Sequence, residues 1–107
     1  TEKLLNYVYA DAPNVETLLV STMVPNPDII DSGFNMNQPL FEKEFLDLAK
    51  KYQKNNIHCT VSPMTSMSES ILTVKRFRDY TGNNINHPND FMARLYAQVA
   101  YKTIFKK

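Results

Sequence analysis

One apolar segment constrains the fold of this chain more than any other. Residues 16–24 (ETLLVSTMV) form a nearly unbroken run of apolar and β-branched side chains that ends at Pro25. Polar residues do not alternate with apolar ones along this run, so it predicts a strand that is buried on both faces, as interior strands of parallel sheets are. Such a strand needs a neighbouring strand on each edge and helices on both faces.

The rest of the chain supplies one further strand and several helices. Residues 57–61 (IHCTV) are short and β-branched, which predicts the second strand. Apolar residues at helical spacing predict helices over residues 3–10, 40–54, 62–78 and 88–105. Residues 25–39 hold three of the six prolines of the chain, which predicts a long loop, and loops of this length often have a functional role.

Each of the three longer helices is expected to bury one apolar stripe. The stripes are Phe41, Phe45, Leu48, Ala49 and Tyr52; Met64, Met67, Ile71 and Val74; and Phe91, Leu95 and Val99. Charged residues fill the other face of the helix over residues 40–54, so they are expected to face solvent.

The predicted order is helix, strand, helix, strand, helix, helix. Strands separated by helices indicate an α/β fold with a parallel sheet and right-handed crossovers. Two strands are too few, however, because a two-stranded parallel sheet leaves its edges unpaired and does not cover the apolar helix faces. We therefore expect residues 1–107 to be one partial domain, whose other strands lie on a missing segment, a second chain or a swapped partner.

Composition excludes several classes of function. Only two glycines occur, which rules out GxGxxG, Walker A and GxSxG motifs, and no cofactor is expected. Twelve basic and eleven acidic residues give a net charge of +1, which argues against nucleic-acid binding. No apolar run approaches the roughly 20 residues that span a bilayer. The single cysteine, Cys59, excludes an internal disulfide and fits either a cytoplasmic or an exported protein.

The strongest candidate for chemistry lies in residues 79–98 (DYTGNNINHPNDFMARLYAQ). His87 directly precedes Pro88, so it is expected at or just before the N-terminus of the last helix. The positive end of the helix dipole favours a neutral imidazole there, which is suited to general-base catalysis. The alternative is that residues 87–90 (HPND) form only a helix-capping sequence with an exposed histidine.

Residues 82–98 (GNNINHPNDFMARLYAQ) resemble the last conserved block of the SGNH, or GDSL-type, esterase and acylhydrolase superfamily. In that block a histidine precedes Pro-Asn or Pro-Asp and a helix with a Tyr-Ala pair. The order of the predicted elements is similar to the C-terminal half of such a domain. The resemblance implies a three-layer α/β/α sandwich with a flavodoxin-like sheet. It also implies a serine hydrolase of acyl or acetyl esters, including carbohydrate esters, in which His87 is the general base.

The nucleophile motif of this superfamily, Gly-Asp-Ser, and its oxyanion-hole blocks belong to the N-terminal half. We therefore expect the nucleophile to lie outside residues 1–107, in a partner half of the same domain. Residues 31–33 (DSG) contain the same residue types in another order, and they are predicted to form a turn rather than to carry a nucleophile at Ser32.

The chain also departs from the superfamily pattern three positions before the histidine. The superfamily usually has an aspartate there, and this chain has Asn84. An asparagine oxygen can orient the imidazole but carries no charge to stabilise imidazolium, and the change costs about 10⁴ in rate in a well-studied triad. Three arrangements remain open: a Ser-His dyad, a backbone carbonyl, or another carboxylate. Asp79 is preferred over Asp90, because Asp90 lies in the first turn of a helix.

Two asparagines are candidates for substrate contacts. Asn26 and Asn35 lie in the loop beyond the first predicted strand, where α/β sheets place ligand-contacting groups, although asparagine is also common in turns. His58 and Cys59 do not have zinc-site spacing, and no metal site is expected. A non-catalytic α/β binding or interaction module, which has lost part of the triad, is the alternative function.

Overall fold

The described residues of the computed structural model, 1–29 and 37–105, form four α-helices, one 3-10 helix and two strands. In chain order the elements are α1 (Glu2–Asp11), β1 (Thr17–Val20), α3 (Asn37–Lys54), β2 (Cys59–Ser62), α4 (Met64–Leu72), η1 (Phe77–Asp79) and α5 (Asp90–Phe105). The predicted α/β class, with strands and helices alternating, is confirmed. No helix in the described ranges is long and apolar enough to cross a membrane.

The two strands pair in parallel, as the sequence predicts. Thr17–Val20 lies opposite Cys59–Ser62. In a parallel ladder, residues that bond to one neighbour alternate with residues that face the other edge. Because Thr17 donates its N–H across the pair, with N···O 2.9 Å, the backbone groups of Leu18 and Val20 point away from β2. No third strand meets that edge within the described residues.

The outer edge of β2 differs from that of β1. The Gln53 side chain of α3 donates from Nε2 to the Cys59 carbonyl oxygen at 2.8 Å, so a side chain takes the place of a neighbouring strand there. The side chain of Val20 on β1 is 44% exposed. Thr17, Leu18 and Leu19 are half-buried and Val20 is exposed, so the predicted burial of the first strand on both faces is not seen within the described residues. The lack of a second neighbouring strand agrees with the prediction that this chain supplies a neighbour on one side at most.

The first strand is also shorter than its apolar run predicts. The Ser21 N–H still donates to the Ser62 carbonyl on β2, at 3.2 Å. Beyond it the backbone donors find partners outside the ladder: the N–H of Met23 donates to the Tyr96 hydroxyl at 2.6 Å, and the N–H of Val24 donates to Ser68 Oγ at 2.9 Å. Side chains of α4 and α5 thus satisfy the backbone that a longer sheet would otherwise bond.

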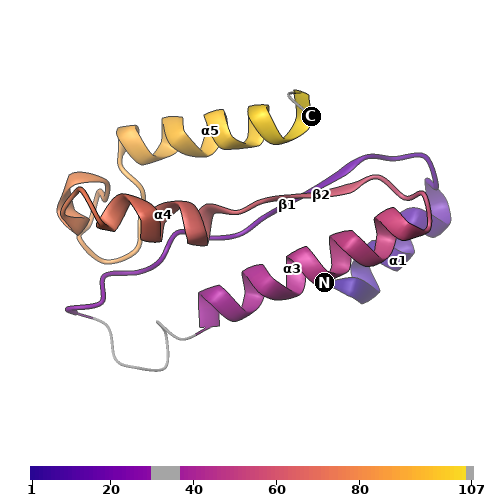
Figure 1. Ribbon diagram of the computed structural model, residues 1–107, viewed down its shortest axis with the longest axis horizontal. Coiled ribbons are helices and arrows are strands. Elements are labelled where there is room, and N and C mark those ends of the chain that lie inside the picture. The colour runs from indigo at the N-terminus through magenta and orange to yellow at the C-terminus, as the bar shows by residue number, and fades with distance from the viewer. Residues whose placement is uncertain (30–36, 106–107) are drawn as a thin grey trace.

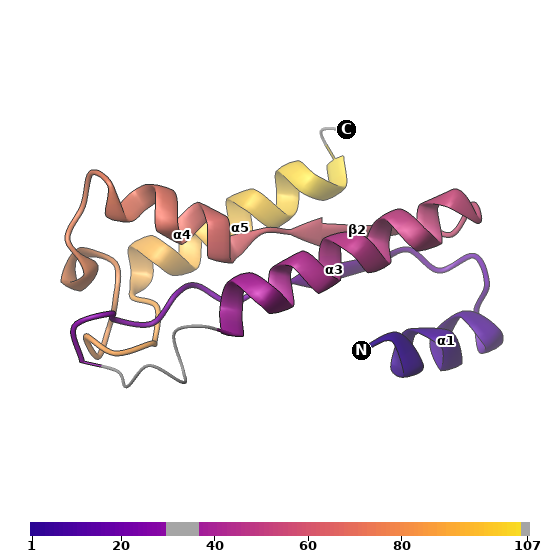
Figure 2. The same cartoon turned by 60° about the horizontal axis from the view of Figure 1, so that its bottom comes forward.

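Helices α3 and α5 lie on opposite sides of the strands, and α1 lies on the side of α3 (Figure 1). In Figure 2, where the bottom of Figure 1 comes forward, α3 crosses in front of the strands. Each side has its own buried cluster. The cluster beside α1 and α3 consists of Leu5, Tyr9, Ala49, Tyr52 and Cys59. The cluster among α4, η1 and α5 consists of Met23, Met64, Phe77, Tyr80, Met92 and Val99.

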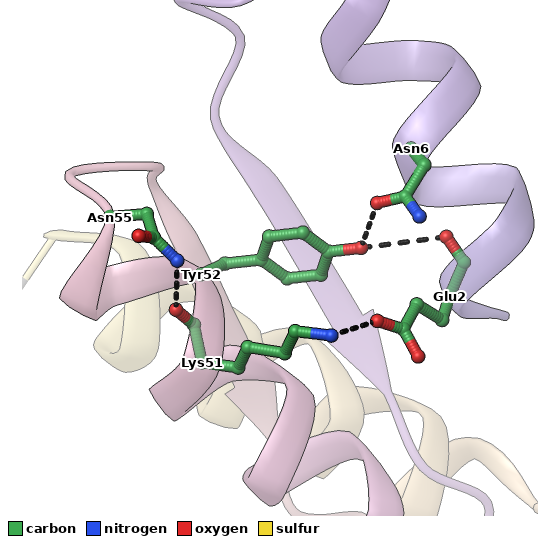
Figure 3. Close-up of polar contacts among 5 residues, drawn as sticks. All are labelled: Glu2, Asn6, Lys51, Tyr52 and Asn55. Atoms are coloured by element: carbon green, nitrogen blue, oxygen red, sulfur yellow. Dashed lines mark hydrogen bonds and ion pairs between the residues drawn. The ribbon is translucent and has the colours of Figure 1, made fainter.

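Polar contacts attach α1 to α3 around one buried tyrosine (Figure 3). The Tyr52 hydroxyl donates to Asn6 Oδ1 at 2.7 Å, and the Tyr52 ring meets Tyr9 edge-on with centroids 4.9 Å apart. Lys51 forms an ion pair with Glu2 at the rim of this contact. The aromatic contact is buried and the ion pair is exposed, so the tyrosines contribute most of the stabilisation.

Helix α3 begins before the predicted position. It starts at Asn37, inside the segment predicted as loop, because Pro39 is tolerated in the first turn of a helix. It ends at Lys54, as predicted from the two asparagines that follow. Asn56 takes a left-handed conformation with φ 59°, and Ile57 N–H donates to the Tyr52 carbonyl at 3.0 Å, which closes the helix end.

Helix α4 ends at Leu72, six residues before the predicted end near Arg78. Ser70 and Thr73 donate from their side chains to backbone carbonyls one turn earlier, at 3.0 and 2.7 Å. Such bonds compete with the helical ladder. Val74, predicted to be in the core, is consequently 82% exposed beyond the helix end.

The predicted stripes of α3 and α5 each have one error. Phe41 is 60% exposed and its neighbour Glu42 is buried, although the charged residues of α3 were expected to face solvent. Phe91 is half exposed and Met92 is fully buried in its place. In both helices the buried face is rotated by one residue from the predicted stripe at the N-terminal end.

Candidate functional site

The candidate site lies where the carboxyl ends of β1 and β2 meet the start of α5 (Figure 1). Residues 82–87, which we call the histidine loop, project from this edge. Thr81 and Pro88 form an antiparallel bridge at the base of the loop, and Gly82 N–H donates to the His87 carbonyl at 2.8 Å. The loop is therefore closed at its base by backbone pairing.

Asn83 holds the inside of the histidine loop. Its Oδ1 accepts from the backbone N–H groups of Ile85, Asn86 and His87 at 2.9, 3.0 and 3.0 Å. Asn84, next in sequence, has φ 57°, the left-handed conformation that asparagine tolerates better than most residues. Asn83 is not among the site residues predicted from the sequence. The available signal was the capacity of asparagine to accept from backbone groups two to four positions later in a turn.

Asn26 attaches the loop after β1 to the histidine loop. This residue is buried, its backbone N–H donates to the Ile85 carbonyl at 2.8 Å, and its Nδ2 donates to the Asn84 carbonyl at 2.9 Å. Its Oδ1 accepts from the backbone N–H of Asp28 at 3.0 Å. The structure thus brings together two of the residues singled out in the sequence, Asn26 and Asn84, through the backbone of Asn84.

His87 is exposed. Its backbone N–H and carbonyl both form hydrogen bonds, to Asn83 and Gly82, whereas its imidazole ring forms none within the described residues. Within the described residues no hydrogen bond or ion pair joins the imidazole to Asn84, Asp79 or Asp90. Asp79 instead accepts the Arg76 N–H at 3.0 Å and stabilises the start of η1. The roles of Asn84 and Asp79 in orienting the imidazole stay predictions.

Helix α5 begins two residues later than predicted. Its first residue is Asp90, because Asn89 Oδ1 caps the N–H of Met92 at 3.0 Å and Asn89 Nδ2 donates to the Asp79 carbonyl at 2.9 Å. Pro88 takes part in the bridge at the base of the loop rather than in the helix. His87 consequently precedes the capping residue by two positions.

The other candidates lie elsewhere. Asn35 and Ser32 fall outside the described residues. His58 is exposed at the amino end of β2, beside a small cavity of about 170 Å³ far from the histidine loop. Cys59 is fully buried. No group of three His, Cys, Asp or Glu side chains in ranges 1–29 and 37–105 is placed to hold a metal ion.

A buried carboxylate near the same edge of the sheet was not anticipated. Glu42 Oε2 accepts from Ser21 Oγ at 2.5 Å and from the Thr65 N–H at 2.9 Å. Its Oε1 accepts from both the N–H and the hydroxyl of Ser66. Burial alone would raise the pKa of Glu42, but the hydrogen bonds from Ser21, Ser66 and the backbone outweigh burial and hold the pKa below its ordinary value.

Glu42 caps α4, which has no side-chain cap of its own because Pro63 occupies the N-cap position. We call Glu42, Ser21, Thr65 and Ser66 the carboxylate cluster. A helix start without a capping side chain was the signal in the sequence, since its free N–H groups need an acceptor from another element.

The hydroxyl of Tyr80, next to the histidine loop, is buried without a hydrogen-bond partner within the described residues. Burial raises the pKa of Tyr80 to about 12. Its ring packs on Phe77 with centroids 4.9 Å apart, so the residue anchors the base of the loop through apolar contacts.

One further hollow adjoins the histidine loop. Its volume is about 470 Å³, and it is lined by Asn26, Pro27, Asp28, Ile29, Leu72, Lys75, Arg76, Phe77, Arg78 and Asn84. We call it the basic groove, because three of its lining residues are cations and one is a carboxylate.

Comparison of the chain with family models, curated proteins and solved structures gives no match.

Proposed function

We propose that this chain is the C-terminal part of a serine ester hydrolase and that His87 is its general base. The observation that supports the proposal is the way the histidine loop holds His87. Asn83 and Gly82 fix the backbone of His87 from both sides, while the imidazole is exposed at the carboxyl edge of a parallel sheet. Ligands of α/β sheets bind at this edge.

In this proposal the imidazole takes the proton of a serine hydroxyl as the serine oxygen attacks the ester carbonyl. The protonated ring then gives that proton to the leaving alcohol, and an acyl-enzyme remains. In the second half of the cycle the imidazole takes a proton from water as the water oxygen attacks the acyl carbonyl. The protonated ring then returns that proton to the serine oxygen as the acid leaves, which regenerates the serine and the neutral imidazole. The serine and the oxyanion hole belong to a part of the domain outside residues 1–107.

The free edge of β1 supports the proposal that the domain continues there. Leu18 and Val20 have backbone groups that point away from β2, and Val20 is 44% exposed. A further parallel strand at this edge would satisfy those groups and extend the sheet toward the three-layer α/β/α sandwich of the SGNH type. On β2, by contrast, Gln53 already occupies an outer acceptor.

The test uses the intact protein and the two histidines of the chain. His87→Ala should lower 4-nitrophenyl acetate turnover by about 10²- to 10⁴-fold, the usual contribution of a general base. His58→Ala is the matched control, because His58 is also exposed but lies at the opposite end of the strands, and its turnover should match the wild type. Unchanged turnover in His87→Ala would remove His87 from the mechanism.

Labelling with a fluorophosphonate tests where the nucleophile lies. The label should appear on a serine outside residues 1–107, and His87→Ala should slow its attachment. A label on any serine within the chain, Ser32 and Ser62 included, would contradict the division of the active site.

One observation favours a second candidate function, a non-catalytic binding module. The expected orienting position is occupied by Asn84, and no described side chain forms a hydrogen bond with the imidazole. A wild-type protein that neither turns over esters nor reacts with fluorophosphonate, and whose upstream sequence lacks a Gly-Asp-Ser block, would support this second function.

A further inference from the structure

The basic groove lies beside the histidine loop and is formed by two segments distant in sequence. One wall is the chain after β1, at Asn26 to Ile29, and the other is the turn from the end of α4 into η1. The histidine loop also lines the groove, through Asn84. The volume, about 470 Å³, falls within the range of about 300–1,000 Å³ that is typical of small-ligand sites.

The groove concentrates positive charge. Lys75, Arg76 and Arg78 line it with Asp28 as the carboxylate of the lining, whereas the whole chain has a net charge of only +1. Like charges gathered in a concave surface focus the potential and attract anions. An anionic group is therefore favoured in the groove.

The two arginines are available to a ligand. The ion pairs of the described residues are Lys43–Asp47 and Lys51–Glu2, so neither guanidinium is neutralised by a carboxylate within ranges 1–29 and 37–105. The adjacent Asp79 uses its carboxylate on the Arg76 backbone N–H, at 3.0 Å, rather than on a guanidinium.

The backbone that carries the arginines is held in place by its neighbours. Phe77, between Arg76 and Arg78, is buried and packs on Tyr80. Lys75 Nζ lies 5.3 Å from the centre of the Phe91 ring, a cation–π contact that holds this side chain against α5. The two arginines are thus presented from an anchored turn, and guanidinium groups bind carboxylates and phosphates through paired hydrogen bonds.

The groove and His87 are connected through hydrogen bonds. Asn26, in one wall of the groove, donates to the carbonyls of Asn84 and Ile85, and the same short loop then reaches His87. We propose that the basic groove binds a carboxylate or phosphate group of the ester substrate while the ester bond lies at His87. This proposal rests on the proposed function, and it specifies the substrate class as anionic esters.

The first experiment measures anion binding by the intact protein. Inorganic phosphate and succinate are titrated separately by NMR, and the arm that saturates identifies the anion preferred. Arg76→Ala/Arg78→Ala should weaken binding at least tenfold, and Asp28→Asn should strengthen it. Lys3→Ala/Lys50→Ala is the control, because it removes the same net charge from exposed positions on α1 and α3. Equal weakening in both double variants, or no binding by the wild type, would overturn the proposal.

The second experiment separates this proposal from the proposed function. The ratio of kcat/KM for mono-4-nitrophenyl succinate to kcat/KM for 4-nitrophenyl acetate should fall about tenfold in Arg76→Ala/Arg78→Ala. The ratio should stay at the wild-type value in Lys3→Ala/Lys50→Ala. Anion binding without turnover of either ester contradicts the esterase and retains the anion site. Turnover of both esters with an unchanged ratio in the arginine variant contradicts the anion site and retains the esterase.

Discussion

The carboxylate cluster and the histidine loop both lie at the carboxyl end of the sheet, but the central side chain of one is fully hydrogen-bonded and that of the other is not. Glu42 is 3% exposed, and both of its oxygens accept hydrogen bonds from Ser21, Thr65 and Ser66. His87 is exposed, and the hydrogen bonds go to its backbone instead of its ring. A side chain with all its bonding capacity used inside the protein stabilises the fold, whereas a free side chain on a fixed backbone is available to a substrate.

The largest expected effect is on the carboxylate cluster. Glu42→Ala should lower the free energy of unfolding by about 2–4 kcal/mol, because the N–H and hydroxyl of Ser66 lose their acceptor and the buried Thr65 N–H keeps only Ser21 Oγ, at 3.1 Å. Urea denaturation measures the change. Glu44→Ala, an exposed carboxylate on the same helix, is the control and should change stability by less than about 0.5 kcal/mol. Equal effects of the two variants would mean that the cluster is not the cap of α4.

Acid should act on the same cluster. The pKa of Glu42 is lower in the folded protein than its ordinary value of 4.5, so its contribution to stability is complete above that pH. The contribution is lost as the pH falls through the lowered folded value. Glu42→Gln should therefore flatten the fall of stability at acid pH, and a curve parallel to that of the wild type would contradict this account.

An intermediate effect is expected at Asn83, whose side chain accepts backbone N–H groups of the histidine loop as Glu42 accepts those at the start of α4. Asn83→Ala removes the acceptor of three backbone N–H groups and should cost about 1 kcal/mol, less than Glu42 because the loop is exposed. Turnover of 4-nitrophenyl acetate should fall with it, since the backbone of His87 loses its support. Asn83→Asp keeps an acceptor oxygen and should restore most of both properties.

Asn86→Ala provides the control for Asn83, being the same change in the same loop. The Asn86 side chain makes one contact, with Asn83 at 3.2 Å, and its backbone N–H keeps its bond to Asn83. Turnover lost equally in the two variants would show that Asn83 has no special part in holding the loop.

The smallest effect is expected at Tyr80, a buried polar group without the partners that Glu42 has. Tyr80→Phe removes a hydroxyl with no described hydrogen bond, so stability at neutral pH should change by less than about 0.5 kcal/mol, or rise slightly. Burial raises the pKa of Tyr80 from 10.0 to about 12, so wild-type stability falls as the pH rises above 10. Tyr80→Phe should show a shallower fall in thermal denaturation between pH 10 and 12. A loss of several kcal/mol at neutral pH would reveal a hydrogen bond to the hydroxyl.

The sequence predicts the order of the elements because each element is determined by local pattern. Residues 57–61 and the start of the run at residue 16 indicate β2 and β1, and the two asparagines after Lys54 correctly indicate the end of α3. The position of His87 in a loop before the last helix was also predictable, since Pro88 and the helical pattern that follows mark that boundary.

The sequence does not reveal features that depend on a distant partner. Burial of Glu42 in place of Phe41 depends on the uncapped start of α4, which is more than twenty residues away and joins α3 only in the folded chain. The early end of β1 likewise depends on hydroxyls of Tyr96 and Ser68 that accept its continuing backbone. Local periodicity contains no information on such contacts, so it predicted a longer strand and a solvent-facing carboxylate.

The parallel pairing of β1 with β2 has a consequence for how the chain reaches its fold. Ser21 and Ser62, which bond at the end of the pair, are 41 positions apart. Closing a flexible loop of that length costs about 3 kcal/mol in chain entropy before any contact is gained. Helix α3 lies within this loop and forms through local bonds, which shortens the flexible part of the span. The short sheet thus rests on non-local pairing, and its assembly depends on the helix that connects its strands.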